Sequence, residues 1–144
     1  MKTLDTRDLN KRKEELESLR DALEEARKEL ADISLTLTGD EAEEAIEEAQ
    51  EAVDSSLADF GDDEAEELAE LEELESQISD WRYGETMIPV DDFEEYAREL
   101  AEDIGAINRD ASWPLYCIDW EKAAKELAMD YTEVEYLGTS YYIR

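Results

Sequence analysis

The chain contains no histidine, and among its 144 residues it has a single cysteine, five glycines and two prolines. Without histidine, serine–histidine–acid triads and the usual zinc sites are excluded, and so is the commonest general base. One cysteine cannot form an intrachain disulfide or a CxxC site. Because the neighbours of Cys117 in LYCID are apolar, we predict that it is a buried small hydrophobic residue and not a nucleophile.

Ligand-binding motifs are also missing. No GxGxxG or GxxxxGK[ST] pattern occurs, so the usual phosphate-binding loops are excluded, and no acidic stretch fits the EF-hand pattern. We therefore expect no cofactor and no dedicated metal site. The chain has no apolar run near 18 residues and no secretory segment, which predicts a soluble intracellular protein. Hydrophobic residues make up 42% of the chain, enough to form a core.

Negative charge is abundant and unevenly distributed. The net charge is −30, a field that repels nucleic acid and anionic membranes and attracts basic protein surfaces. Residues 1–28 carry eight Lys/Arg and eight Asp/Glu, whereas residues 29–81 carry 21 Asp/Glu and no Lys or Arg. Residues 82–144 carry 15 acidic and six basic residues. The middle third therefore holds most of the charge.

A seven-residue repeat of leucine runs through the N-terminal part. This spacing indicates a long helix with a coiled-coil seam, interrupted only at Arg12. The seam residues are Leu9, Leu16, Leu19, Leu23, Leu30, Ile33 and Leu37, with Ala26 between them. Such a seam is an assembly or packing surface.

Two acidic helices are predicted to follow. Gly39 suits the end of the first helix, and Asp40 with Glu43 resembles a capping box for the next. A break at FGDD then precedes a third segment that Asp62 or Asp63 would cap. The apolar positions of the two segments are Ala42, Ile46, Ala49, Val53, Ser56 and Phe60, then Leu68, Leu71, Leu74, Ile78 and Trp81. Short connections predict an antiparallel helical hairpin or three-helix coiled coil, which makes residues 1–81 the first domain.

Residues 82–144 are predicted to form a second, small α+β domain. Gly84 and Pro89 mark a loop or short strand, and Asp91 with Glu94 resembles a capping box for a helix that ends at Gly105. Asp119 is expected to cap a further short helix. The tail, YTEVEYLGTSYYIR, alternates around Leu137–Gly138 and predicts a terminal β-hairpin. The chain as a whole is therefore expected to be mostly helical α+β.

Three stretches of this second domain resemble the C-terminal domain of the ArdA antirestriction family. They are DDFEEYARELAEDIGAI, WPLYCIDWEKAAKEL and YTEVEYLGTSYYIR, which cover about residues 88–144. The family has a YA-x-E-L helix, then a Y-x-I-D-aromatic-E-x-x-A-x-acid-L helix, then a short aromatic strand. The matching positions are Tyr96, Ala97, Glu99 and Leu100, then Tyr116, Ile118, Asp119, Trp120, Glu121, Ala124, Glu126 and Leu127, and finally Tyr141 to Ile143.

The resemblance implies a function as well as a fold. Family members, carried by phages and mobile elements, are acidic dimers that mimic bent DNA and occupy the DNA cleft of type I restriction–modification enzymes. It thus implies antirestriction and evasion of host defence in the bacterial cytoplasm, by binding a basic DNA-binding protein and not nucleic acid or membrane. The family's preceding domains are small mixed α/β units, whereas this chain has Glu-rich helices there, so only the fold of the last domain is expected to carry over.

The acidic segment supports DNA mimicry independently of the family resemblance. Residues 40–80 contain 19 carboxylates, about one per 3 Å of helix axis, and one DNA strand presents a phosphate about every 3.4 Å. The predicted partner-binding residues are Asp40, Glu41, Glu44, Glu47, Glu48, Glu51, Asp54, Asp59, Asp62, Asp63, Glu66, Glu67, Glu70 and Glu73. A solubilising face and adaptation to high salt are the alternatives, although the neutral residues 1–28 argue against the latter.

Two functions therefore remain open, an inhibitor that mimics DNA and a coiled-coil structural or assembly protein with a solubilising acidic face. An enzyme is not expected, because carboxylate pairs are too common here to be diagnostic and no cofactor motif accompanies them. A homodimer is open too, since the seam can be satisfied within one chain or between two.

Overall fold

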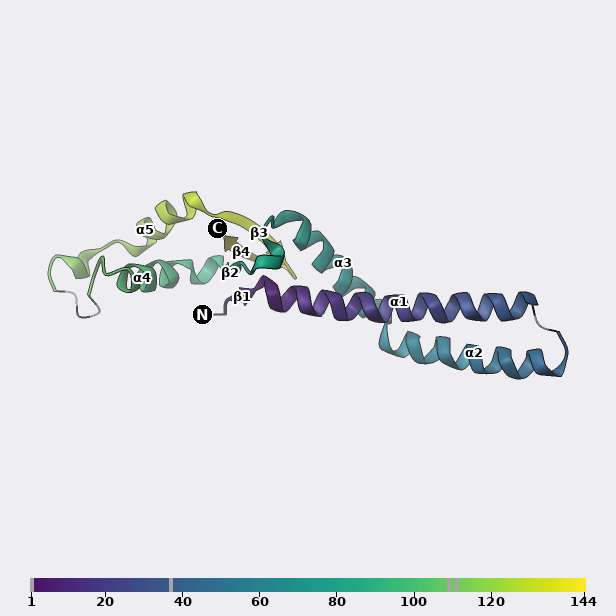
Figure 1. The fold of residues 1–144 in the computed structure, drawn as a ribbon. Helices are drawn as coiled ribbons and strands as arrows, with labels where there is room; N and C mark the ends of the chain where they lie inside the picture. The colour runs from purple at the N-terminus through teal and green to yellow at the C-terminus, as the bar shows by residue number, and fades with distance from the viewer. Residues whose placement is uncertain (1, 37, 109, 111) are drawn as a thin grey trace. The chain divides into compact units, whose positions relative to one another are not determined.

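The structure is a computed structural model that describes residues 2–36, 38–108, 110 and 112–144. It confirms the mostly helical α+β class (Figure 1). The chain forms two compact units. We call Asn10–Glu73 the helical unit, and the residues up to Leu9 together with Leu74–Arg144 the mixed unit. The boundary expected between residues 81 and 82 falls inside the mixed unit, because a short N-terminal strand and the end of the third helix belong to it.

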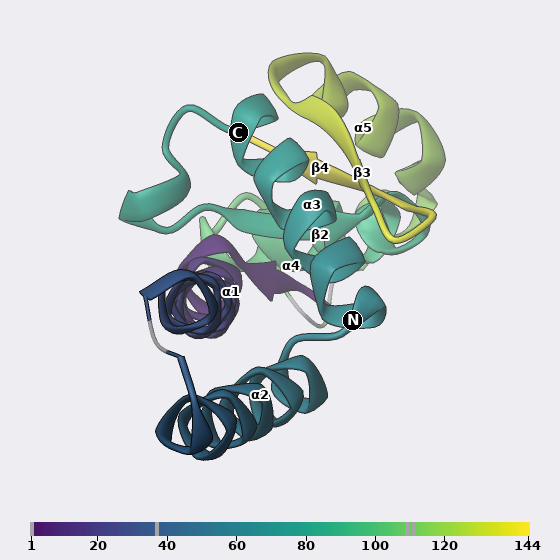
Figure 2. The ribbon, with the colours of Figure 1, turned by 90° about the vertical axis from the view of Figure 1, so that its right-hand side faces the viewer.

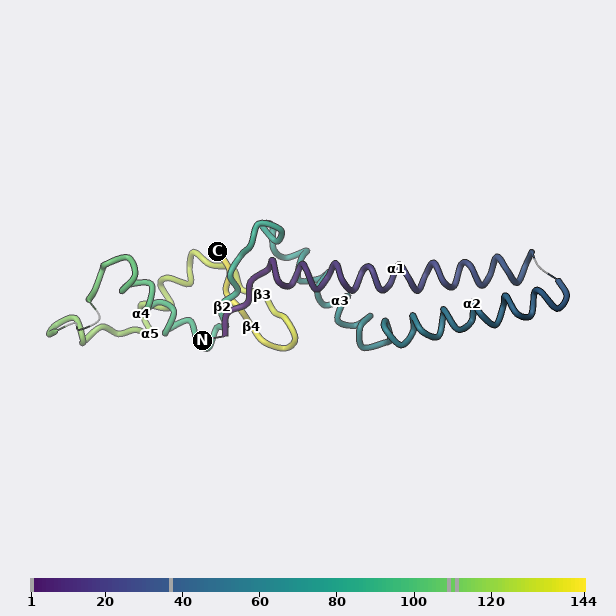
Figure 3. The backbone as a smooth tube through the Cα atoms, turned by 60° about the horizontal axis from the view of Figure 1, so that its bottom comes forward, coloured from purple at the N-terminus to yellow at the C-terminus, as the bar shows by residue number. Residues whose placement is uncertain are grey.

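Three helices carry the acidic part of the chain. They are α1 (Thr6–Thr36), α2 (Asp40–Asp59) and α3 (Asp62–Gln77). Within the helical unit, α2 runs back alongside α1 as an antiparallel hairpin (Figures 2 and 3). The chain breaks at Phe60, which has φ −130° and ψ 79°, so FGDD ends one helix and starts another. Of the seam, Leu37 lies outside the described residues.

Glycine and not aspartate sets the start of both acidic helices. The expected cap Asp40 is already the first residue of α2, and Gly39, at φ 90°, takes the cap position without a side-chain hydrogen bond. Only glycine adopts this φ readily, so Gly39 takes the cap position and α2 begins at Asp40, one residue earlier than an Asp40 cap predicts. At α3, the Gly61 amide donates to Glu64 Oε2 at 3.2 Å, which is half of a capping box.

A four-stranded antiparallel sheet forms one layer of the mixed unit. Its order is β1 (Leu4–Asp5), β2 (Thr86–Pro89), β4 (Thr139–Ile143) and β3 (Thr132–Tyr136). The predicted hairpin is confirmed, with Leu137 at φ 49° and Gly138 at φ 76° forming the two-residue turn. Strand β1 was not predicted, because two residues are too few to show an alternating pattern.

Helices α4 (Phe93–Asp103) and α5 (Trp120–Leu127) complete the mixed unit. Phe93 is buried, and its ring centroid lies 4.7 Å from that of Tyr142 and 5.1 Å from that of Tyr131. The Tyr131 hydroxyl lies 3.1 Å from that of Tyr96, and burial raises the pKa of Tyr131 to about 12. Ala124 of α5 belongs to the same core as Phe93, so this cluster joins both helices to the sheet.

Two of the three predicted helix ends in this unit are confirmed. The Asp119 side chain accepts from the Lys122 amide at 3.2 Å and caps α5. At the end of α4, the Gly105 and Ala106 amides donate to the carbonyls of Glu102 and Ala101, as in a Schellman motif. The capping box at Asp91 is wrong, because a 3₁₀ turn (Val90–Asp92) leads directly into α4 and the chain is already helical there.

The connection between α4 and α5 corrects another prediction. Cys117 is exposed, as are Tyr116, at 66%, and Trp113, at 72%. These residues belong to a surface loop with a 3₁₀ turn (Leu115–Cys117), where too few neighbours are available to cover apolar side chains. Apolar composition alone therefore gave the wrong burial for Cys117.

Thr6 ties the N-terminal strand to the rest of the mixed unit. It is fully buried, its amide donates to the Glu85 carbonyl at 2.9 Å, and its Oγ1 accepts from the Glu85 amide at 2.7 Å. The two bonds continue the antiparallel pairing of β1 with β2 at the first residue of α1. A hydroxyl is needed here because the helix start leaves no backbone acceptor for the Glu85 amide.

We expect Thr6→Val to lower the free energy of unfolding by about 1 kcal/mol, since the partly buried Glu85 amide would lose its acceptor while the side-chain volume stays about the same. Urea unfolding followed by near-UV absorption of the mixed unit's aromatics measures this. Thr3→Val, at an exposed position, is the matched control. An equal effect from both variants would contradict the role given to the Thr6 hydroxyl.

Candidate partner-binding acidic surface

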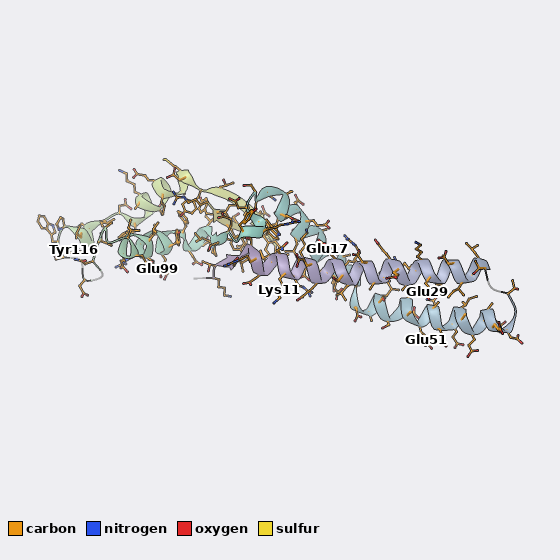
Figure 4. The ribbon with its side chains drawn as sticks, viewed as in Figure 1. Lys11, Glu17, Glu29, Glu51, Glu99 and Tyr116 are labelled. Carbon is orange, nitrogen blue, oxygen red and sulfur yellow. The ribbon has the colours of Figure 1, made fainter. Side chains whose placement is uncertain are left out.

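The structure exposes thirteen of the fourteen predicted partner-binding carboxylates, and only Glu67 is half-buried. The apolar stripes of α2 and α3 explain this placement. Ala42, Ala49 and Val53 of α2 are buried, so the intervening carboxylates face solvent. Glu51, for example, lies on the side of α2 turned away from α1 (Figure 4). The same helical periodicity that forms the seam therefore orders the charge.

No Lys or Arg of the described chain forms an ion pair with a carboxylate of α2. The helix carries nine carboxylates in 20 residues, all exposed. Gln50 donates to Asp54 Oδ1 at 3.0 Å, and glutamine brings no positive charge. Like charges at i,i+4 oppose helix formation by about 0.2–0.5 kcal/mol per pair, so α2 depends on its packed face for stability.

Helix α3 differs, because two arginines of α1 partly neutralise it. Arg12 makes a bidentate pair with Glu67, with Nε to Oε1 at 2.9 Å and Nη2 to Oε2 at 3.1 Å. Arg20 lies 3.5 Å from Glu72. The residue that interrupts the leucine row thus has a partner on α3, and Glu67 belongs to this ion pair as well as to the acidic surface.

The pair shifts the pKa values of both groups. The hydrogen bonds that Arg12 donates to Glu67 lower the pKa of Glu67 and raise the pKa of Arg12. Both side chains stay partly exposed, at 42% for Arg12 and 33% for Glu67, so solvent screens the interaction and its contribution is modest.

A second acidic surface lies on α1, where sequence analysis did not place one. Its members line one shallow hollow: Asp21, Glu24, Glu25, Glu29 and Asp32, with Lys28 among them. Glu29 is labelled in Figure 4. Balancing charges over residues 1–28 concealed this surface, although the i, i+4, i+8 spacing of Asp21, Glu25 and Glu29 already placed them on one face of a helix.

The predicted seam is covered unevenly. Leu16 is fully buried and Leu23 is 5% exposed, whereas Leu9, Leu19, Leu30 and Ile33 are half-buried. Leu9 itself belongs to the mixed unit. Opposite the later part of the seam, α2 offers mainly alanine, whose small side chain covers little of a leucine. The seam therefore retains partly exposed apolar surface toward the end of α1.

The described residues offer no grouping of three or more Cys, Asp or Glu side chains that could hold a metal ion. In the same part of the chain no helix combines the length and apolarity needed to cross a bilayer. What the acidic surface offers chemically is a dense set of exposed carboxylates on helices, suited to contact many cationic groups at once.

Comparison with known proteins gave no match for this chain. No protein-family model matches the chain. Neither the curated proteins nor the solved structures give a match. The resemblance of residues 88–144 to the ArdA C-terminal domain therefore stays a prediction from the residues themselves.

A double-mutant cycle with Arg12→Gln and Glu67→Gln should give a coupling of about 0.5–1 kcal/mol near neutral pH. The folded-state pKa of Glu67 is lowered, so this contribution is present above its unfolded pKa of about 4.3 and is lost as pH falls through the folded value. Urea unfolding at about pH 7 and about pH 3 measures the coupling free energy and its loss at low pH.

The control cycle pairs Arg12→Gln with Glu66→Gln. Glu66 is an exposed neighbour of Glu67, and no hydrogen bond or ion pair joins it to Arg12 in the described chain. The control cycle should show coupling near zero at both pH values. Equal coupling in the two cycles would mean that Arg12 acts through the general field of α3 and not through the bidentate pair.

Proposed function

We propose that the protein is an inhibitor that mimics DNA and binds the basic DNA cleft of a host defence enzyme. The observation that carries this proposal is the exposed, ordered array of carboxylates on α2 and α3, with no cation paired to α2 among the described residues. A solvated helix ordinarily mixes charges, because Glu–Lys pairs at i,i+4 stabilise it. Segregation of one sign over two helices favours a surface that meets the opposite sign.

The density of charge supports the same proposal. Nine carboxylates on the 20 residues of α2 and nine on the 16 residues of α3 correspond to about 3 Å of axis per charge. This approaches the spacing of about 3.4 Å between phosphates on one DNA strand. The break at Phe60 divides the array into two straight runs, so the mimic presents two short segments of charge and not one continuous line.

The mechanism involves no covalent chemistry, and the protein is not an enzyme. Carboxylates steer the protein toward a Lys/Arg-lined cleft and compete there with DNA. The resemblance of residues 88–144 to the ArdA family favours a type I restriction–modification enzyme as the target, in the cytoplasm of a bacterial host. Such a protein would be carried by a phage or mobile element and would act in antirestriction.

A second candidate is a coiled-coil assembly protein, whose acidic face only keeps it soluble. The observation that favours it is the incomplete cover of the seam: Leu30 and Ile33 are half-buried, and Leu35 is 84% exposed. Another helix, from a partner or a second copy, could cover this surface and form a homodimer. Charge removal separates the candidates, since assembly through the seam does not need the carboxylates of α3.

The triple variant Asp63→Asn, Glu66→Gln, Glu70→Gln should weaken inhibition of DNA binding by a type I restriction–modification enzyme about ten-fold. Each exposed ion pair in the complex contributes about 0.5 kcal/mol, and about 1.4 kcal/mol corresponds to a factor of ten. Circular dichroism should show an intact fold. The matched control, with Glu126, Glu133 and Glu135 changed to Gln, makes the same charge change on exposed residues of the mixed unit.

Equal loss in both triple variants would show that only net charge matters, and no loss in either would favour the assembly protein.

Inhibition should also weaken steeply with salt, by at least about ten-fold between about 50 and about 200 mM, because several charge contacts are screened together. Measuring the inhibition constant of the unmodified protein across this range tests the electrostatic mechanism without any variant. Affinity that changes less than about two-fold would rule out a complex held by carboxylates in a basic cleft.

A further inference from the structure

A hollow of about 240 Å³ lies in the mixed unit between α4 and α5. Its floor is apolar, formed by Phe93, Ala124, Ala128 and Tyr142, with Val90 beside them. Phe93 and Ala124 are core residues, and the ring of Tyr142 packs against that of Phe93. The floor is therefore held in place by the aromatic cluster, so the hollow belongs to the packed part of the unit.

The rim of this hollow is negatively charged. Asp91, Glu94 and Glu121 line it together with one cation, Lys125, whose Nζ lies 3.3 Å from Glu121 Oε1. Within the described chain, no Lys or Arg pairs with Asp91 or Glu94. Two carboxylates at the edge of an apolar floor are thus left without a cation of their own.

An adjoining hollow extends the surface along α4. Asp91 and Glu94 line it as well, and Glu95, Arg98 and Trp120 complete it. The guanidinium of Arg98 lies 6.0 Å from the ring centroid of Trp120 and pairs with Glu102 at 3.9 Å. The only cation of this hollow is therefore already engaged, and Glu95 adds a third carboxylate with no cation paired to it among the described residues.

Size decides what kind of occupant fits. At about 240 Å³ the hollow is smaller than the range of about 300–1,000 Å³ that is typical of ligand pockets. It suits one long side chain better than a cofactor or drug-sized molecule. An apolar floor with an anionic rim matches arginine, whose methylene stem covers apolar surface while its planar guanidinium pairs with carboxylates.

We propose that this hollow binds an arginine side chain from a basic segment of a partner protein. The stem lies over Phe93 and Ala124, and the guanidinium donates to Asp91 and Glu94. The next hollow, with Glu95 beside Trp120, receives a neighbouring part of the same segment. Because the site lies in the mixed unit and is apolar as well as acidic, it does not depend on DNA mimicry by α2 and α3.

The test uses a short glycine peptide, capped at both ends, with one central arginine, titrated into the ¹⁵N-labelled full chain. We expect chemical-shift changes concentrated at the amides of residues 90–94 and 121–128 and at Tyr142. The same peptide with citrulline, which keeps the shape and loses the charge, should bind at least about five-fold more weakly, because charge-assisted hydrogen bonds to the carboxylates are lost. Shifts spread evenly over α2 and α3 would overturn the proposal, as would equal binding of the two peptides.

Matched variants locate the site. Glu94→Gln removes a rim charge and should weaken binding of the arginine peptide at least about three-fold. Glu133→Gln, at an exposed position on β3, makes the same change elsewhere in the mixed unit and should have little effect. Val90→Thr keeps the side-chain volume, adds a hydroxyl to the floor and should also weaken binding. Equal effects of Glu94→Gln and Glu133→Gln would reduce the interaction to net charge and overturn the site.

Sedimentation of the same variants tests another possible occupant of the hollow, a second copy of the chain. If Glu94→Gln changes the oligomeric state while the peptide leaves it unchanged, the hollow is an interface between copies of the chain, and the proposal of an arginine-bearing partner is wrong. An unchanged state, with weakened peptide binding, supports it. Failure here would leave the inhibition experiments on α3 unaffected, so the two proposals can fail separately.

Discussion

Repulsion among the carboxylates of α2 and α3 is the constraint that the helical unit has to satisfy. Eighteen of them lie on 36 helical residues, and neither helix contains a cation to relieve them. What opposes this repulsion lies on α1, where Leu16 and Leu23 supply buried apolar surface and Arg12 supplies a bidentate partner for Glu67. Helix α1 therefore has a mixed composition for a physical reason, because it holds together two helices that would repel each other if isolated.

The helices also differ in how many of their carboxylates form ion pairs. Arg12 and Arg20 pair with carboxylates of α3, whereas the buried residues of α2 are alanine and valine and none of its carboxylates pairs with a Lys or Arg of the described residues. On α1, Arg20 pairs with Asp21, and Lys28 lies among the carboxylates of the hollow.

Periodicity over long stretches was the part of the sequence that predicted structure well. Helices α1, α2 and α3, the break near Gly61, the cap Asp119 and the terminal hairpin all follow from repeated spacing or from residues with a strong local preference. Features that depend on tertiary contacts were not predicted from the sequence. They are the pairing of Leu4 with Met87, the exposure of Cys117 and the hollow beside Phe93. The acidic residues of α1 were visible as a helical face but were hidden by counting net charge over a window that also contained lysine and arginine.

Strand β1 pairs with β2, and β2 pairs with β4, so the first and last strands of the chain belong to one sheet. In topological terms, the helical unit is an insertion between the first two strands of a small α+β domain. Heptads could be added to or removed from α1 and α2 together while the sheet register stays the same. The acidic hairpin is thus a module whose length can vary independently of the domain that carries it, and such variation would change how much charge is displayed without redesigning the rest of the protein.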